Sequence, residues 1–343
     1  MPGAPAGIVR ARGSALALGL LCLAGMVLLV AFFSVTVGAR PITLETVWTA
    51  LTAFDPASTD HRIIWELRLP RTAIGLAVGA ALGLSGAVLQ GATRNPLADP
   101  SILGIHAGAA VFVVLGVAVF GITQLGMYVW LAFIGAGAAM LVVYAVASLG
   151  REGATPVKLA LAGAAMTAAM QSVTNAILLT SPRTLDEIRF WQVGSLVGRD
   201  MDIFIQVAPF LAIGIVLALA SGRMLDGLSM GADVARALGQ NVGRSRARAG
   251  LAAVILAGGA TAAAGPIAFV GLTVPHVSRA ITGPNYRWIL PYSMLLAPIL
   301  LLGADVIGRI IAPPGEVQVG IVTAFLGAPF FIALVRRRKL ATL

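Results

Sequence analysis

Residues 15–37 form the stretch ALALGLLCLAGMVLLVAFFSVTV, which contains no charged residue and follows Arg10 and Arg12. A transmembrane helix needs about 20 mostly apolar residues, so this stretch is long enough to cross a lipid bilayer. It is also longer than the apolar core of a secretory signal peptide, which has about 7–15 residues. We therefore expect a retained first transmembrane helix whose N-terminus lies inside the cell.

The rest of the chain has the same character. Of its 343 residues, 58% are apolar and only 11% are charged, whereas a soluble domain carries about 25% charged residues. Disordered chains are poor in Leu, Val and Ile, and this one is not. The formal net charge of +10 comes from basic residues that lie between apolar runs, not in one patch. We therefore expect an all-α integral membrane protein whose partner is the lipid bilayer and not a nucleic acid.

Apolar runs separated by turn or charged residues predict about ten membrane-spanning helices. They lie near residues 15–37, 72–91, 101–122, 126–149, 157–180, 203–221, 248–264, 266–280, 289–312 and 317–335. The eighth run contains Pro266, Pro275, His276 and Arg279, which predicts a short or broken helix. With ten crossings, sixteen of the 24 basic residues lie inside, including those of the C-terminal tail. Basic residues favour the cytoplasmic side, so we expect both termini in the cytoplasm.

Two segments outside the membrane are long enough to hold short helices. Residues Thr43–Phe54 predict a helix at the membrane interface. Between the fifth and sixth runs, Thr184 and Glu187 have the spacing of a capping box, which predicts a helix over Leu185–Trp191.

One sizeable hydrophilic segment lies inside, over residues 223–248. Within it, Ser229 is a candidate N-cap and Gly239 a candidate C-terminal stop for a short helix. Composition alone leaves two interpretations open, an ordinary basic loop or a helix that contacts another protein.

No motif for catalysis or cofactor binding stands out. The chain has no Gly-x-x-x-x-Gly-Lys-Ser/Thr sequence for binding nucleotide phosphates. Its single cysteine, Cys22, lies in an apolar run, and His61, His106 and His276 do not have the spacing of metal ligands. We therefore expect a non-enzymatic chain without a cofactor or metal. Any energy for transport would come from another chain or from an ion gradient.

Several motifs occur in one order along the chain, and together they resemble the FecCD family of ABC importer permeases. They are Arg68-Leu-Pro-Arg71, Ser85–Gln90, Arg94–Pro100, Leu103-Gly104, Gly231-x-Asp233-x-Ala-Arg-x-Leu-Gly239-x-Asn241-Val, Gly265–His276 and Gly327–Phe330. The resemblance extends from about residue 62 to the C-terminus, and residues 1–60 match only in hydropathy.

The resemblance implies a type II ABC importer permease fold, with residues 1–343 as a single transmembrane permease domain in the cell inner membrane. It also implies a complex. A second permease subunit, expected to be an identical copy, would form the pathway at the interface. Two cytoplasmic ABC ATPase subunits would bind ATP and Mg²⁺, and an external binding protein would deliver the cargo.

By the same resemblance, the coupling helix that contacts the ATPase contains Gly231, Asp233, Arg236, Leu238 and Gly239. A short capped helix between two spans can transmit a push without changing shape. Asp233 and Arg236 are three residues apart, so they can also simply pair with each other.

Arg68 and Arg71 match positions where the family contacts acidic residues of its binding protein, and Arg309 matches a third. A guanidinium group can hold a carboxylate through two hydrogen bonds, which suits such docking. Two alternatives stay open. Arg68 and Arg71 could extend along the membrane interface, and Arg309 could pair with Asp305, four residues earlier on the same helical face.

The resemblance places cytoplasmic gates at Asn95, Pro96 and Leu97 and at Thr155 and Pro156. Proline fixes the local backbone and suits a rigid constriction, but it suits an ordinary turn equally well.

Gln171 and Asn175 share one face of the fifth span. Polar side chains in a membrane helix need a partner or water. The resemblance assigns them to the wall of the pathway, and hydrogen bonding between helices is the alternative.

Segment 184–199 resembles the ferric siderophore members of the family more than the cobalamin members. The expected cargo is therefore a ferric siderophore, with haem or cobalamin as alternatives, and His276 is expected to pack between helices. A secondary transporter driven by an ion gradient would need titratable groups inside the spans, and Asp305 is the clear candidate.

Overall fold

The computed structural model describes residues 6–101, 103–149, 155–313 and 315–337, and every regular element among them is a helix. The elements are α1 (Ala6–Thr36), α2 (Leu44–Thr52), α3 (Thr59–Arg62), the π-helix η1 (Ile63–Arg68), α4 (Leu69–Thr93), α5 (Ile105–Phe120), α6 (Leu125–Ala147), α7 (Pro156–Thr180), α8 (Pro182–Gln192), α9 (Met201–Ala220), α10 (Gly222–Ser229), α11 (Ala232–Ala237), α12 (Val242–Ala264), α13 (Val270–Thr282), α14 (Tyr286–Ile311) and α15 (Val319–Arg337).

The long helices confirm the expected all-α membrane fold of about ten spans. Among the described residues, six helices are long and apolar enough to cross a membrane, and two shorter apolar helices accompany them. The remaining two expected spans correspond to α7, which carries more polar residues, and to the short helix α13.

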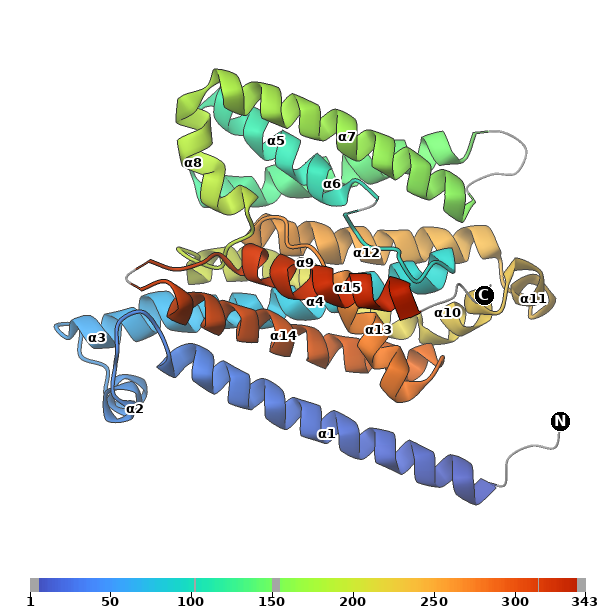
Figure 1. Cartoon of the computed structure of the whole chain (residues 1–343), viewed down its shortest axis with the longest axis horizontal. Coiled ribbons are helices and arrows are strands. Elements are labelled where there is room, and N and C mark those ends of the chain that lie inside the picture. Colours follow the sequence, from blue (N-terminus) through green and yellow to red (C-terminus); the bar gives the residue numbers. More distant parts are fainter. Residues whose placement is uncertain (1–5, 102, 150–154, 314, 338–343) are drawn as a thin grey trace.

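The ends of the bundle differ. Helix α1 begins and α15 ends at the end that carries α10 and α11, whereas α2, α3 and α8 lie at the opposite end (Figure 1). An even number of crossings returns the chain to its starting side, so this arrangement agrees with ten spans. We call these two regions the α10/α11 end and the α2/α8 end.

Helix α4 is the centre of the bundle and packs against α9, α12, α13 and α14. Glycines let these neighbours approach closely. A Cβ atom at Gly86 would overlap the carbonyl oxygen of Gly271, in the first turn of α13. A Cβ atom at Gly83 would lie within 2.6 Å of the Cβ atom of Ala297 on α14. The small residues of α4 therefore decide how near the last helices lie.

Helix α1 lies at the periphery, beside α14 (Figure 1). Its side chains Leu18, Leu21 and Leu28 are exposed, as expected for a helix in contact with lipid. The hydroxyl group of Tyr292 on α14 donates a hydrogen bond to the carbonyl oxygen of Leu16, at 2.9 Å.

The expectation of a short or broken eighth helix is confirmed. Residues 265–268 are not helical, and α13 has only 13 residues. It begins after Phe269, whose φ of 69° lies in the left-handed region and breaks the path from α12.

Two predicted helix starts were wrong. Helix α8 begins at Pro182, and the hydroxyl oxygen of Ser181, not Thr184, caps it. A proline needs no hydrogen bond acceptor at the first helical position, so the helix starts earlier than the capping box suggested. Ser229 does not cap α11, because it ends α10 and donates to the carbonyl oxygen of Asp226. Gly231, with φ of 119°, separates the two helices.

Candidate functional site

At the α2/α8 end, Arg68 closes the end of α1. Its Nη1 donates to the carbonyl oxygens of Val35 (2.8 Å) and Thr36 (2.7 Å), and its Nη2 donates to that of Arg40 (2.6 Å). The last carbonyl groups of a helix have no partner within the helix, and a cation there also stabilises the negative end of the helix dipole. Arg68 is only 4% exposed. It therefore joins η1 to α1.

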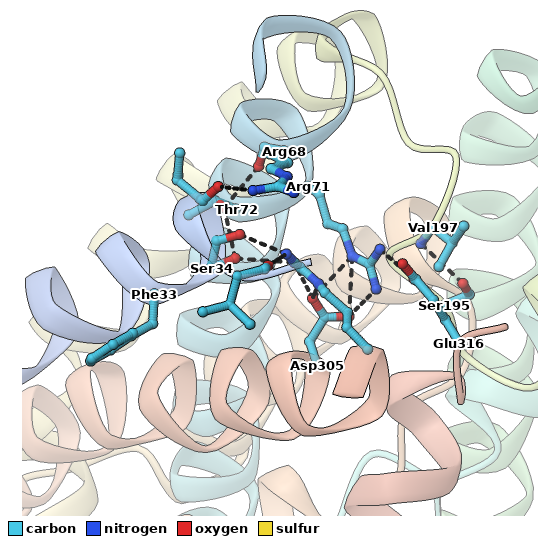
Figure 2. Close-up of polar contacts among 12 residues, drawn as sticks. Phe33, Ser34, Arg68, Arg71, Thr72, Ser195, Val197, Asp305 and Glu316 are labelled. Carbon is cyan, nitrogen blue, oxygen red and sulfur yellow. Dashed lines mark hydrogen bonds and ion pairs between the residues drawn. The ribbon is translucent and has the colours of Figure 1, made fainter. Parts of the chain in front are cut away.

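Beside it, Asp305 of α14 binds two buried arginines (Figure 2). Arg71 of α4 donates from Nη2 to Oδ1 at 2.7 Å and from Nε to Oδ2 at 3.0 Å. Arg309 donates to the same carboxylate and to the carbonyl oxygen of Ser34 at 2.6 Å. Arg71 also forms an ion pair of 2.6 Å with Glu316, which follows α14. The cluster joins α1, α4 and α14.

The three arginines predicted to dock a binding protein are thus occupied by partners within the chain. The competing pair of Arg309 and Asp305 is observed, whereas docking by Arg68, Arg71 and Arg309 stays a prediction. To bind a carboxylate of another protein, Arg71 would first have to release Asp305 or Glu316. Only the local pair of Arg309 and Asp305 could be predicted from their spacing, since Arg71 and Asp305 are far apart along the chain.

At the opposite end of the bundle, α10 and α11 form a protruding segment (Figure 1). Asp233 and Arg236 form an ion pair of 2.7 Å and both are exposed. Gly239 has φ of 79°, and the amide of Gln240 donates to the carbonyl oxygen of Ala235. This is the hydrogen bond pattern of a glycine-terminated helix, so the predicted stop at Gly239 is confirmed.

Three apolar side chains of this segment point into solvent. Met230, Val234 and Leu238 are 56%, 44% and 62% exposed. Exposed apolar groups that cluster on a protein surface mark contact sites for other proteins or for membranes. The charged motif residues and Leu238 were named from the sequence, but Met230 and Val234 were missed.

The segment is anchored to the bundle through Asp226. Its carboxylate accepts a hydrogen bond of 2.7 Å from the backbone N–H of Tyr286, in the first turn of α14. Partial burial raises the pKa of Asp226, against the opposing effects of this hydrogen bond and of Arg287. A carboxylate beside a helix N-terminus is favourable, so the contact fixes α10 to α14.

From there the contacts continue to α13 and α4. Arg279 of α13 donates to the Tyr286 hydroxyl group at 3.2 Å and to Gln90 of α4 at 3.3 Å. Also on α13, the Nε2 of His276 donates to the carbonyl oxygen of Pro96 at 2.8 Å. His276 therefore packs between helices as expected, and it contacts the predicted gate residue Pro96.

The two predicted gate segments have separate local structures. In a turn after α4, the side-chain Oδ1 of Asn95 accepts a hydrogen bond from the backbone N–H of Leu97. Thr155 caps α7 by accepting the backbone N–H of Lys158, and Pro156 occupies the first helical position. Both turns lie at the α10/α11 end, but their action as gates stays a prediction.

Gln171 and Asn175 lie on an exposed face of α7 and bind each other, with Nε2 of Gln171 3.0 Å from Oδ1 of Asn175. Their face also contains exposed Ala164, Ala168 and Ser172, together with exposed Leu161 and Leu179. Small and polar residues in the middle of a span are typical of helix contacts or water-lined surfaces in membranes. Pathway lining by the pair stays a prediction.

No group of three or more His, Cys, Asp or Glu residues that could hold a metal ion occurs within the described ranges. The arrangement is thus a helical bundle with a charged cluster at one end and a protruding helical segment at the other.

The model of the FecCD transport family matches residues 26–337. The chain belongs to this family. It is therefore a multi-pass membrane protein and a permease subunit of an ABC importer.

Relatives and a solved structure agree. The ferric enterobactin permease FepD of Escherichia coli is 45% identical, over 89% of this chain and 91% of the relative. The iron(3+)-hydroxamate permease FhuB of Bacillus subtilis is 42% identical, over 92% of this chain and 83% of the relative. A solved structure, described as a candidate metal-chelate type ABC transporter facing inward, superposes with a TM-score of 0.80. It is 26% identical and covers 93% of this chain and 98% of its own.

Proposed function

We propose that this FecCD permease moves a ferric siderophore across the cell inner membrane into the cytoplasm. The observation that carries the proposal is the identity of 42–45% with the enterobactin and hydroxamate permeases over most of both chains. The whole chain acts as one permease domain, with both termini in the cytoplasm. The α2/α8 end then faces the external side.

Two cytoplasmic ATPase subunits bind ATP and Mg²⁺ and contact the α10/α11 segment. Its exposed Val234 and Leu238 fit a groove on the ATPase, and the Asp233–Arg236 pair lies at the rim. Motion of the α10/α11 segment reaches the Pro96 turn through a chain of contacts that join α10 to α14, α14 to α13, and α13 to this turn.

A second, identical permease subunit covers the polar face of α7. This face carries Gln171 and Asn175, whose burial against lipid would leave polar groups in hydrocarbon. A pathway between two α7 helices keeps these amides in contact with water or with the partner.

An external binding protein docks at the α2/α8 end with acidic residues near Arg68, Arg71 and Arg309. In the permease alone, Asp305 and Glu316 occupy the guanidinium groups of Arg71 and Arg309. Docking therefore requires an exchange of carboxylate partners, which makes it sensitive to ionic strength.

Coupling to an ion gradient is the rival function. It would use Asp305 as a proton-binding or ion-binding group, but this carboxylate already holds two guanidinium groups. Binding of a transported ion at Asp305 would first require these buried ion pairs to break.

The test is uptake into proteoliposomes that contain the permease, its ATPase and its binding protein. Radiolabelled ferric siderophores, haem and cobalamin are supplied separately, with or without internal ATP. We expect ATP-dependent uptake of one ferric siderophore. ATP-dependent uptake of haem or cobalamin alone would overturn the cargo, and uptake driven by an ion gradient without the ATPase would overturn the mechanism.

A further inference from the structure

An apolar pocket opens between α4, α6 and α12, near the α10/α11 end of the bundle. It has a volume of about 450 Å³ and is lined by 14 residues, nearly all apolar. On α12 the lining extends from Arg246 to Val254, and on α6 from Gly137 to Tyr144. At the helical rise per residue, each wall is about 10–12 Å long. The pocket therefore extends along both helices over this distance.

Two glycines make room for the pocket. A Cβ atom at Gly137 would meet nothing within 4 Å, and one at Gly250 would meet only the end of the Met140 side chain, at 3.4 Å. Neither glycine is needed for close helix packing at these points. At the pocket mouth, Leu141 and Leu251 are exposed on the helices that would face lipid. The shape and lining fit a hydrocarbon chain that enters from the bilayer.

A single charged residue lines the pocket. Arg246 is half-buried and lies in the second turn of α12, where the helix enters the membrane. Arg244 and Arg248, two residues away on either side, line a different cavity together with Arg223. The apolar wall and its guanidinium group thus share one side of α12. Basic pockets between helices near the cytoplasmic surface bind the head groups of anionic lipids.

We propose that this pocket binds one anionic phospholipid from the leaflet at the α10/α11 end. An acyl chain lies between α6 and α12, and the phosphate group contacts Arg246. The pocket also reaches Leu89, Ala92 and Thr93, the last turns of α4 before the Asn95–Leu97 turn. A bound lipid therefore supports α4 where it approaches the predicted gate. The proposal depends on neither the cargo nor the direction of transport.

The test uses the full importer complex in nanodiscs of phosphatidylglycerol and phosphatidylethanolamine, followed by transfer to mild detergent. Native mass spectrometry then counts the lipids that each subunit retains. We expect the wild-type complex to retain phosphatidylglycerol in preference to phosphatidylethanolamine. Arg246→Gln should reduce this retention about tenfold, because a hydrogen bond to a charged group is lost. Arg246→Lys should keep most of it.

Matched variants distinguish lipid binding in this pocket from nonspecific electrostatic attraction of anionic lipids to the protein. Arg248→Gln removes the same charge from the same helix outside the pocket, and retention should not change. Gly137→Leu should fill the pocket and abolish retention, whereas Gly25→Leu on lipid-exposed α1, where a Cβ also meets nothing within 4 Å, should not. Equal losses in Arg246→Gln and Arg248→Gln, or no retained lipid because a partner subunit covers the pocket, would overturn the proposal. Melting temperature and gel filtration confirm that each variant is folded.

Discussion

Asp305 of α14 binds Arg71 of α4 through both carboxylate oxygens, with N–O distances of 2.7 and 3.0 Å. Both groups are buried, Asp305 being 1% and Arg71 9% exposed. Removing one member of a buried ion pair costs about 3–5 kcal/mol, because the other charge stays buried without compensation. We expect Asp305→Asn to lower the stability of the purified permease by this order, measured by thermal unfolding in detergent.

Asp186→Asn is the control for this variant. Asp186 also pairs with an arginine, Arg189, but both side chains are mostly exposed. Exposed pairs contribute little, so the melting temperature should not change. Equal melting temperatures for Asp305→Asn and the wild type would contradict a stabilising role of the cluster.

Gly86 allows the close approach of α4 and α13. Gly86→Val would place side-chain atoms against the Gly271 carbonyl group. Overpacking of this kind costs about 1–3 kcal/mol, so we expect a lower melting temperature and less uptake. Gly303→Val on α14, where a Cβ meets nothing within 4 Å, is the matched control and should behave as the wild type. A neutral Gly86→Val would show that α13 is free to shift.

His276 connects α13 to the predicted gate by donating to the Pro96 carbonyl oxygen. His276→Leu removes this donor, and we expect more ATP hydrolysed per siderophore transported, because motion of α13 no longer moves the turn. His276→Gln retains an N–H donor and should preserve more of the coupling. The measurement is the ratio of ATP hydrolysis to uptake in proteoliposomes. An unchanged ratio in His276→Leu would assign the contact to packing alone.

The exposed apolar face of α11 should contribute more to ATPase binding than the charged pair. We expect Val234→Ser with Leu238→Ser to weaken co-purification of the ATPase more than Asp233→Ala with Arg236→Ala. Burial of apolar area supplies most association energy, whereas an exposed ion pair adds little. The opposite order would assign recognition to the charges.

Asp226 should give the permease a measurable pH dependence. Partial burial raises its pKa in the folded state, so the folded chain binds this proton more tightly than the unfolded chain does. This tighter proton binding stabilises the folded state. Its contribution is complete below the ordinary pKa of Asp226 and is lost as the pH rises through the raised pKa. Asp226→Asn keeps an oxygen for the Tyr286 N–H but cannot titrate. The difference in melting temperature between the wild type and Asp226→Asn should therefore change with pH between the ordinary and the raised pKa of Asp226. A difference that stays constant would contradict a raised pKa of Asp226.

The sequence by itself determined the membrane-spanning helices and their approximate number. Apolar runs such as residues 15–37 are helical in lipid because each backbone group must find its hydrogen bond nearby. The prolines and polar residues of 265–283 predicted the short helix α13, and Gly239 predicted the end of α11. The motif residues identified the family. These features depend on interactions between residues close along the chain.

Only the tertiary structure decided which distant groups meet. Arg71 and Asp305 are 234 residues apart, and His276 and Pro96 are 180 apart. Local sequence sets each helix, but it does not set the rotation and depth at which α4, α13 and α14 pack. Those depend on close contacts such as that between Gly86 and Gly271. Arg68 therefore matched a docking motif in the sequence, while the folded chain uses its guanidinium group to bind the last carbonyl groups of α1.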